Sequence, residues 1–82
     1  MIMDQTIKSF AEIVSSLLME FINSSGFRNI DLKNQQRIHH LCFLCNLIRD
    51  IGQGYELILE EHSIIKVCTY ELHNEKLKSF KH

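Results

Sequence analysis

The string from His39 to Cys45, HHLCFLC, holds the side chains of this sequence that are best suited to chemistry. A His before a Cys-x-x-Cys pair could bind zinc, which accepts imidazole nitrogen and thiolate sulfur as ligands. A structural zinc site needs four ligands, and no second Cys-x-x-Cys is present. On a helix, His39, Cys42 and Cys45 would drift apart by about 60° per step. The pattern therefore favours small, buried, apolar cysteines over a metal site.

A fourth metal ligand could come only from His62, Cys68 or His73. A redox role for the Cys pair would require the start of a helix, where the helix dipole lowers the pKa of a thiol, but the pair lies two to three turns into one. His39 and His40 could carry a phosphoryl group, yet their bulky neighbours favour ordinary exposed histidines. No phosphate-binding glycine loop or serine nucleophile elbow is present. We therefore expect no enzyme activity, no metal and no cofactor.

The length and charge of the chain describe one ordinary domain. Its 82 residues are 45% hydrophobic, and nine Lys and Arg stand against ten Asp and Glu. A chain of this size has one modest core, and its balanced charge argues against partners that are bound mainly by charge, such as nucleic acid. We expect a single helical domain over residues 1–82, with residues 76–82 as a frayed basic tail.

The three cysteines and the hydropathy pattern indicate a compartment. Three cysteines cannot all pair within one chain, and the first residues, MIMDQTIK, lack the basic start of a secretory signal. The longest uncharged run near the middle of the chain, Ile38 to Ile48, has 11 residues, whereas a membrane span needs about 20. We expect free thiols in a cytoplasmic protein that does not enter a membrane.

The first element that positions these side chains is a helix from Asp4 to about Asn23. Its apolar residues recur at spacings of three and four, which is typical of an amphipathic helix. Asp4 is the expected N-cap, and Ser24-Ser25-Gly26 is the expected stop. The apolar positions are Ile7, Phe10, Ala11, Val14, Leu17, Leu18, Phe21 and Ile22.

The second element is a helix over residues 31–50, with Asp31 as N-cap and Gly52 as the residue that ends it. One broad apolar face comprises Ile38, Leu41, Cys42, Leu44, Cys45, Ile48 and Ile51. Phe43 and Leu47 fall on the opposite side. A helix that is apolar on two sides needs two partners, and the chain offers few other elements. We therefore expect a homodimer whose interface contains Phe43, Leu47 and His40.

The third element, from Tyr55 to about Lys78, is compatible with two structures. As a helix it aligns most apolar residues on one face, but Glu61 lies in the middle of that face. As a β-hairpin it would suit the β-branched and aromatic content, but Glu61-His62-Ser63 is a poor turn. The sequence therefore favours an all-α domain of three helices. The alternative is two helices plus a C-terminal β-hairpin, which would be winged-helix-like.

Two functions remain compatible with this pattern. A helix, a Ser-Ser-Gly turn and a second helix resemble a helix-turn-helix, in which Arg28, Lys33 and Arg37 could contact DNA. With Gly26 in the turn, however, Ile22 falls where a small residue is needed. We favour a small cytosolic regulatory or adaptor protein that binds an unidentified protein through helical surfaces, with a small DNA-binding transcriptional regulator as the alternative.

Overall fold

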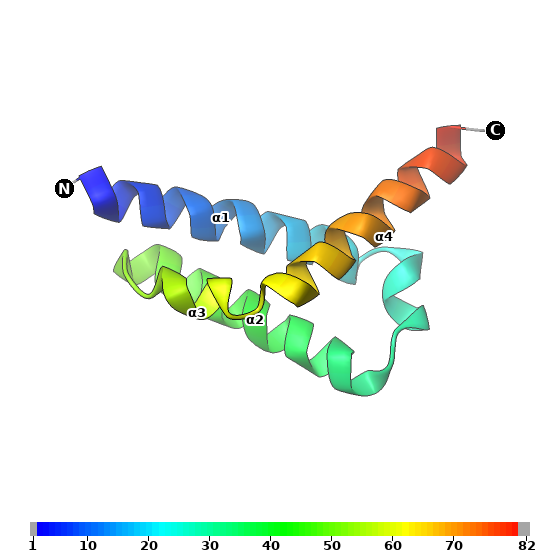
Figure 1. The fold of residues 1–82 in the computed structure, drawn as a ribbon, viewed down its shortest axis with the longest axis horizontal. Coiled ribbons are helices and arrows are strands. Elements are labelled where there is room, and N and C mark those ends of the chain that lie inside the picture. The colour runs from blue at the N-terminus through cyan, green and yellow to red at the C-terminus, as the bar shows by residue number, and fades with distance from the viewer. Residues whose placement is uncertain (1, 81–82) are drawn as a thin grey trace.

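The computed structural model describes residues 2–80, and every regular element in that range is helical (Figure 1). The elements are α1 (Ile2–Ile22), the 3-10 helix η1 (Ser25–Asn29), α2 (Leu32–Ile51), α3 (Tyr55–Leu59) and α4 (His62–Phe80). α1 and α2 run antiparallel as a pair, and α4 crosses the pair before its end projects away from it (Figure 1). The predicted all-α class is confirmed, and the β-hairpin alternative is wrong.

The expected third helix is two helices, because the chain turns at Glu60 and Glu61. An uninterrupted helix would place the Glu61 carboxylate on the apolar face, where a charge is costly. At the turn, the Glu61 carbonyl accepts the amide N–H of Ile65 at 3.2 Å, which starts α4. The Glu61 carboxylate instead reaches the Arg37 guanidinium at 2.8 Å. The misfit that the sequence showed at Glu61 therefore marks a helix break.

The helix ends follow the local signals in part. α1 begins at Ile2, so that the expected N-cap at Asp4 is wrong. Asp31 is the N-cap residue of α2, but its carboxylate accepts the Asn34 amide at 2.7 Å rather than a backbone N–H. Gly52 ends α2 with a φ of 82°, a left-handed conformation that glycine adopts without strain.

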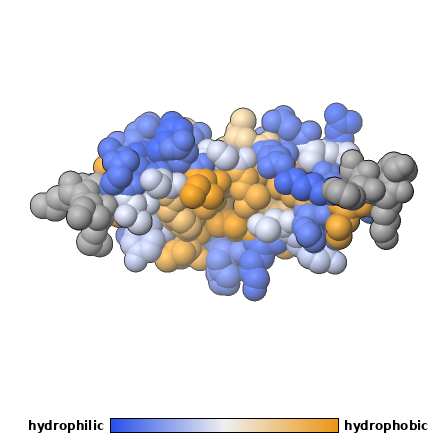
Figure 2. Space-filling view, turned by 90° about the horizontal axis from the view of Figure 1, so that it is seen from above, coloured by the Kyte–Doolittle hydropathy of each residue, from blue (hydrophilic) through white to orange (hydrophobic). Residues whose placement is uncertain are grey.

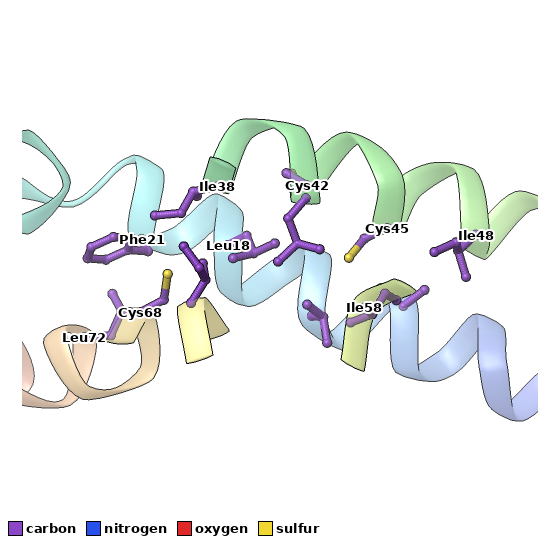
Figure 3. Close-up of a cluster of buried hydrophobic side chains, with 13 residues drawn as sticks. Leu18, Phe21, Ile38, Cys42, Cys45, Ile48, Ile58, Cys68 and Leu72 are labelled. Carbon is purple, nitrogen blue, oxygen red and sulfur yellow. The ribbon is translucent and has the colours of Figure 1, made fainter. Parts of the chain in front are cut away.

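The core lies where the inner faces of α1 and α2 meet, with α3 and the first half of α4 packed against them. Figure 3 shows side chains from all four α-helices in one cluster, among them Leu18, Cys45, Ile58 and Cys68, none of which is exposed to solvent. Each large apolar side chain buried in this way contributes about 1.5 to 3 kcal/mol. Among residues 73–78 no side chain is fully buried, so that the second half of α4 adds little to the core.

One acidic side chain ties the later part of α4 to the connection between α1 and α2. The Glu75 carboxylate accepts hydrogen bonds from the Ser25 hydroxyl and the Gly26 amide, both at 2.8 Å. α4 stays helical to Phe80, and residues 81 and 82 lie outside the described part of the chain. Fraying of residues 76–82 therefore stays a prediction.

The chain has more surface than a compact monomer of its size. Its accessible surface is 6040 Å², whereas a folded monomer of 9.7 kDa exposes about 5100 Å². Its radius of gyration is 13.6 Å, against about 12 Å for a compact domain of this length. The extents of 46 × 27 × 18 Å describe a flat, elongated body. The chain thus exposes about 900 Å² more surface than a compact monomer of its mass.

Candidate functional site

The outward side of α2 carries an unbroken line of exposed, uncharged side chains, which we name the outer stripe. All of its side chains are exposed. The outer stripe comprises Leu32, Gln36, His40, Phe43, Leu47 and Ile51. Phe43 is 60% exposed and Leu32 is 68% exposed, values that are high for large apolar residues of a well-formed helix.

Helix geometry places the outer stripe directly opposite the core. Successive residues of an α-helix turn by about 100°, so positions three or four apart share a face. Ile38, Leu41 and Cys45 share the inner face and are almost completely buried. Phe43 and Leu47 lie about half a turn away from them. The structure therefore confirms that Phe43 and Leu47 face away from the core and that His40 is exposed beside them; the dimer itself stays a prediction.

From the sequence, one end residue of the outer stripe, Ile51, was assigned to the wrong side of the helix, and the other, Leu32, was not assigned to a side. Ile51 was expected on the inner face, but it is 59% exposed, which corrects that assignment. Its position three residues after Ile48 rotates it off the buried face, and α2 ends there. Leu32 was not identified as a surface residue. The signal that would have found both is the spacing of four that joins Leu32 to Gln36 and Leu47 to Ile51.

One edge of the outer stripe is bordered by charge. Here α2 and α3 enclose an open hollow of about 270 Å³ lined by Arg37, His40, Leu41, Leu44, Leu57, Glu60 and Glu61. The ion pair between Arg37 of α2 and Glu61, in the turn between α3 and α4, lies at this edge. This edge of the outer stripe thus carries charged side chains, as the rims of protein interfaces do.

The structure places the three cysteines in the core. Cys42, Cys45 and Cys68 are free and buried, which confirms that Cys42 and Cys45 lie on the buried side of α2. Burial raises the pKa of Cys45 to about 11, and the neighbouring Cys42 thiol adds to that rise. Burial also raises the pKa of Cys68 to about 11. Because the thiolate is the form that reacts and binds metals, the raised pKa makes Cys45 and Cys68 less reactive near neutral pH than an exposed thiol.

His39 and His62, two of the candidate metal ligands, both make other contacts. The His39 ring contacts the edge or face of the Phe27 ring, with 5.4 Å between ring centres. His62 pairs its Nδ1 with the carbonyl of Leu59 at 3.2 Å. Within the described residues, no group of three or more His, Cys, Asp or Glu side chains could hold a metal ion.

The residues of the DNA-binding alternative do not gather into one free basic surface. Arg28 lies in η1, Lys33 is exposed in the first turn of α2, and Arg37 is paired with Glu61. Gln35, which lies between Lys33 and Arg37 in the sequence, donates its side-chain amide to two backbone carbonyls, those of Phe27 and Ile30, at 3.1 and 3.0 Å. Its donors are therefore engaged within the protein. The described residues contain no β-hairpin that could act as a wing.

A second apolar surface lies on another side of the molecule. Figure 2 shows a face with apolar side chains along its middle and polar side chains toward both ends. On α1, Ile13 is 68% exposed, and Phe10 and Leu17 are partly buried. Phe10 also lines a small hollow with Tyr55 of α3. The outer stripe is thus not the whole of the exposed apolar surface.

These features define a small all-α domain whose candidate site is an apolar helix face rather than a pocket with convergent polar groups. No family model matches the chain, and neither a curated protein nor a solved structure matches it. Within the described residues, no helix is both long enough and apolar enough to cross a membrane.

Proposed function

We propose that this chain is a small regulatory or adaptor protein that acts by binding proteins, and that it forms a homodimer through the outer stripe. The observation that carries the proposal is the line of six exposed, uncharged side chains along α2. Four of them are large and apolar and are 41% to 68% exposed, so that each leaves part of the roughly 1.5 to 3 kcal/mol of full burial unrealised in the monomer. A helix face of this kind is typical of a surface that a partner covers.

The surface excess supports a second copy as the partner. A standard protein interface buries about 800 Å² on each side. The chain exposes about 900 Å² more than a compact monomer of its mass, which is the same order of area as one such interface. A closed two-fold dimer uses the same patch twice and is the commonest form of oligomer.

The exposed side chain of Ile13 on α1 supports the adaptor role. Ile13 belongs to a different helix and is not part of the outer stripe. A dimer formed through α2 would therefore present two copies of the α1 surface to further partners. Doubling a binding surface in this way raises avidity without any new contact.

We propose a cytoplasmic location, supported by three free thiols, since disulfides are rare in reducing compartments.

The DNA-binding regulator has weaker support, because the Arg37 charge is already paired with Glu61. A DNA binder would bind duplex DNA in a salt-dependent manner, and Lys33→Ala would weaken that binding.

Sedimentation equilibrium at tens of micromolar tests the dimer. We expect the wild type at about twice 9.7 kDa, and Phe43→Glu or Leu47→Glu as a monomer with its helical circular dichroism retained. Tyr70→Glu is the matched control, because Tyr70 is an equally exposed aromatic residue, at 64%, on α4. It should remain a dimer. A monomeric wild type would contradict the proposal, and dissociation by Tyr70→Glu alone would move the interface to α4.

A further inference from the structure

The outer stripe has the same spacing in both directions along α2. Its members follow one another at intervals of 4, 4, 3, 4 and 4 residues, from Leu32 to Ile51. A second copy of the helix turned end over end therefore presents the same pattern of positions. The midpoint of this pattern lies between Leu41 and Cys42.

From this symmetry we propose that two copies of the chain pair through antiparallel α2 helices, about a two-fold axis that passes between residues 41 and 42. The inference rests on the proposed homodimer and names its geometry. In this register His40 lies opposite the partner's Phe43, and by symmetry Phe43 lies opposite the partner's His40. Gln36 comes to the level of the partner's Leu47, and Leu32 to the level of the partner's Ile51.

The ends of the outer stripe select this register. Over a helix of 20 residues, about 30 Å long, it is the arrangement in which all six positions face a stripe position of the other copy. Moving the axis by one turn toward the C-terminus leaves Leu32 without a stripe residue opposite it. Moving it by one turn toward the N-terminus does the same to Ile51. Both residues are large and exposed, at 68% and 59%, so that either shift forfeits burial.

At the centre of the proposed interface, two pairs of aromatic rings meet, and the two-fold axis relates one pair to the other. The rings of His40 and the partner's Phe43 can meet edge to face, which is a preferred geometry for such pairs. The same ring geometry already occurs inside the chain, between His39 and Phe27. The polar side chains of Gln36 and His40 also disfavour other registers of the two helices. Polar residues within an apolar helix interface specify the register at some cost in stability.

Charge favours the antiparallel direction over the parallel one. Residue 33 and residue 50 are equally far from the proposed axis, so Lys33 comes to the level of the partner's Asp50. Both side chains are exposed and carry opposite charges, and Asp50 also contacts the Arg49 guanidinium of its own chain at 3.4 Å. A parallel pair would instead bring Lys33 beside the partner's Lys33, and would align the two helix dipoles in the same direction.

Cysteine cross-linking between two different variants tests the register. Gln36→Cys and Leu47→Cys are prepared separately, mixed, allowed to exchange subunits and oxidised. We expect a disulfide-linked dimer in the mixture, because residue 36 faces residue 47 of the other copy. Each variant alone should stay uncrosslinked: its two new thiols would lie about 16 Å apart along the helix axis, beyond the roughly 7 Å that a disulfide spans between Cα atoms.

The end pair gives an independent second measurement. A mixture of Leu32→Cys with Ile51→Cys should also cross-link, whereas a mixture of Gln36→Cys with Tyr70→Cys should not. Wild-type protein controls for the native thiols, all three of which are buried.

The outcomes separate the register from the dimer. Cross-linking of Gln36→Cys with itself would show either a parallel pair or an antiparallel pair centred near residue 36, and would overturn the register while keeping the dimer. Dimeric protein on sedimentation without either mixed cross-link would also overturn the register alone. Monomeric wild type at tens of micromolar would overturn both the register and the proposed dimer.

Discussion

The two sides of α2 contain residues of similar size and hydropathy, yet the structure treats them in opposite ways. Leu41 on the inner side is 1% exposed, whereas Leu47, six residues later on the same helix, is 41% exposed. The inner side meets α1 and α3, and in the described chain no element covers the outer side (Figure 1). Burial of an apolar residue therefore depends on whether the chain supplies a partner for its face. The outer stripe is what this chain leaves uncovered.

Thiol accessibility should show the largest difference between the two sides. In dilute protein, native Cys45 should react with a thiol reagent roughly a thousand-fold more slowly than an exposed thiol introduced by Phe43→Cys, because Cys45 reacts only after the structure opens. Mass spectrometry of the labelled protein over time would measure both rates. Unfolded protein is the control, in which the two thiols should react alike. Equal rates in native protein would show that Cys45 is not buried.

Truncation of a leucine on each side should separate the two sides in stability. Leu41→Ala should lower the free energy of unfolding by about 2 to 5 kcal/mol, because it leaves a cavity in the core. Leu47→Ala, measured in dilute monomer, should change it by no more than about 0.5 kcal/mol. Urea denaturation followed by circular dichroism gives both values. A large loss for Leu47→Ala would place Leu47 in the core of the monomer.

Alkaline pH should destabilise the inner side through its thiols. The pKa of Cys45 and of Cys68 is about 11 in the folded chain, above the ordinary value of 9.0. Between these values the unfolded chain loses thiol protons that the folded chain keeps, so stability is fully present below about pH 9 and falls as pH rises to about 11. The slope should approach about 1.4 kcal/mol per pH unit for each thiol. Urea midpoints from pH 8 to 11 would measure it.

The control for the alkaline effect is a variant without one of the two thiols. Cys68→Ala should show a shallower loss of stability above pH 9 than the wild type, even though its stability at pH 7 is lower. The Cys on the surface in Phe43→Cys should add nothing to the slope, because its pKa would not differ between the folded and unfolded states. An unchanged slope in Cys68→Ala would contradict the assigned cause.

The ion pair at the border of the two sides should contribute least. Arg37 and Glu61 are partly exposed, with 44% and 31% of their side chains accessible. Exposed ion pairs of this kind contribute about 0 to 1 kcal/mol. Arg37→Gln should therefore lower the unfolding free energy by less than about 1 kcal/mol, and the loss should shrink in high salt. A loss above 2 kcal/mol would show that the pair holds the turn before α4 in place.

Local patterns were sufficient for the elements and for most of the candidate site. The three- and four-residue spacing of apolar positions placed α1 and α2, and Gly52 placed the end of α2, because both signals act within one or two turns. The same spacing placed Phe43, Leu47 and His40 on the outward side. The spacing gave the wrong side for Ile51. This residue comes three positions after the buried Ile48, and that step turns its side chain away from the core.

The sequence by itself determined the helical class, the buried cysteines and the existence of a second apolar side on α2, because these follow from periodicity within a single element. Only the tertiary structure showed the break at Glu60 and Glu61: the sequence placed Glu61 on the apolar face of one long helix, whereas the folded chain turns there and brings Glu61 to Arg37, 24 residues earlier. The tertiary structure also decided which apolar residues remain exposed. A residue is buried only where another element, distant in sequence, packs over it. The spacing of residues within one helix does not specify how far that other element extends.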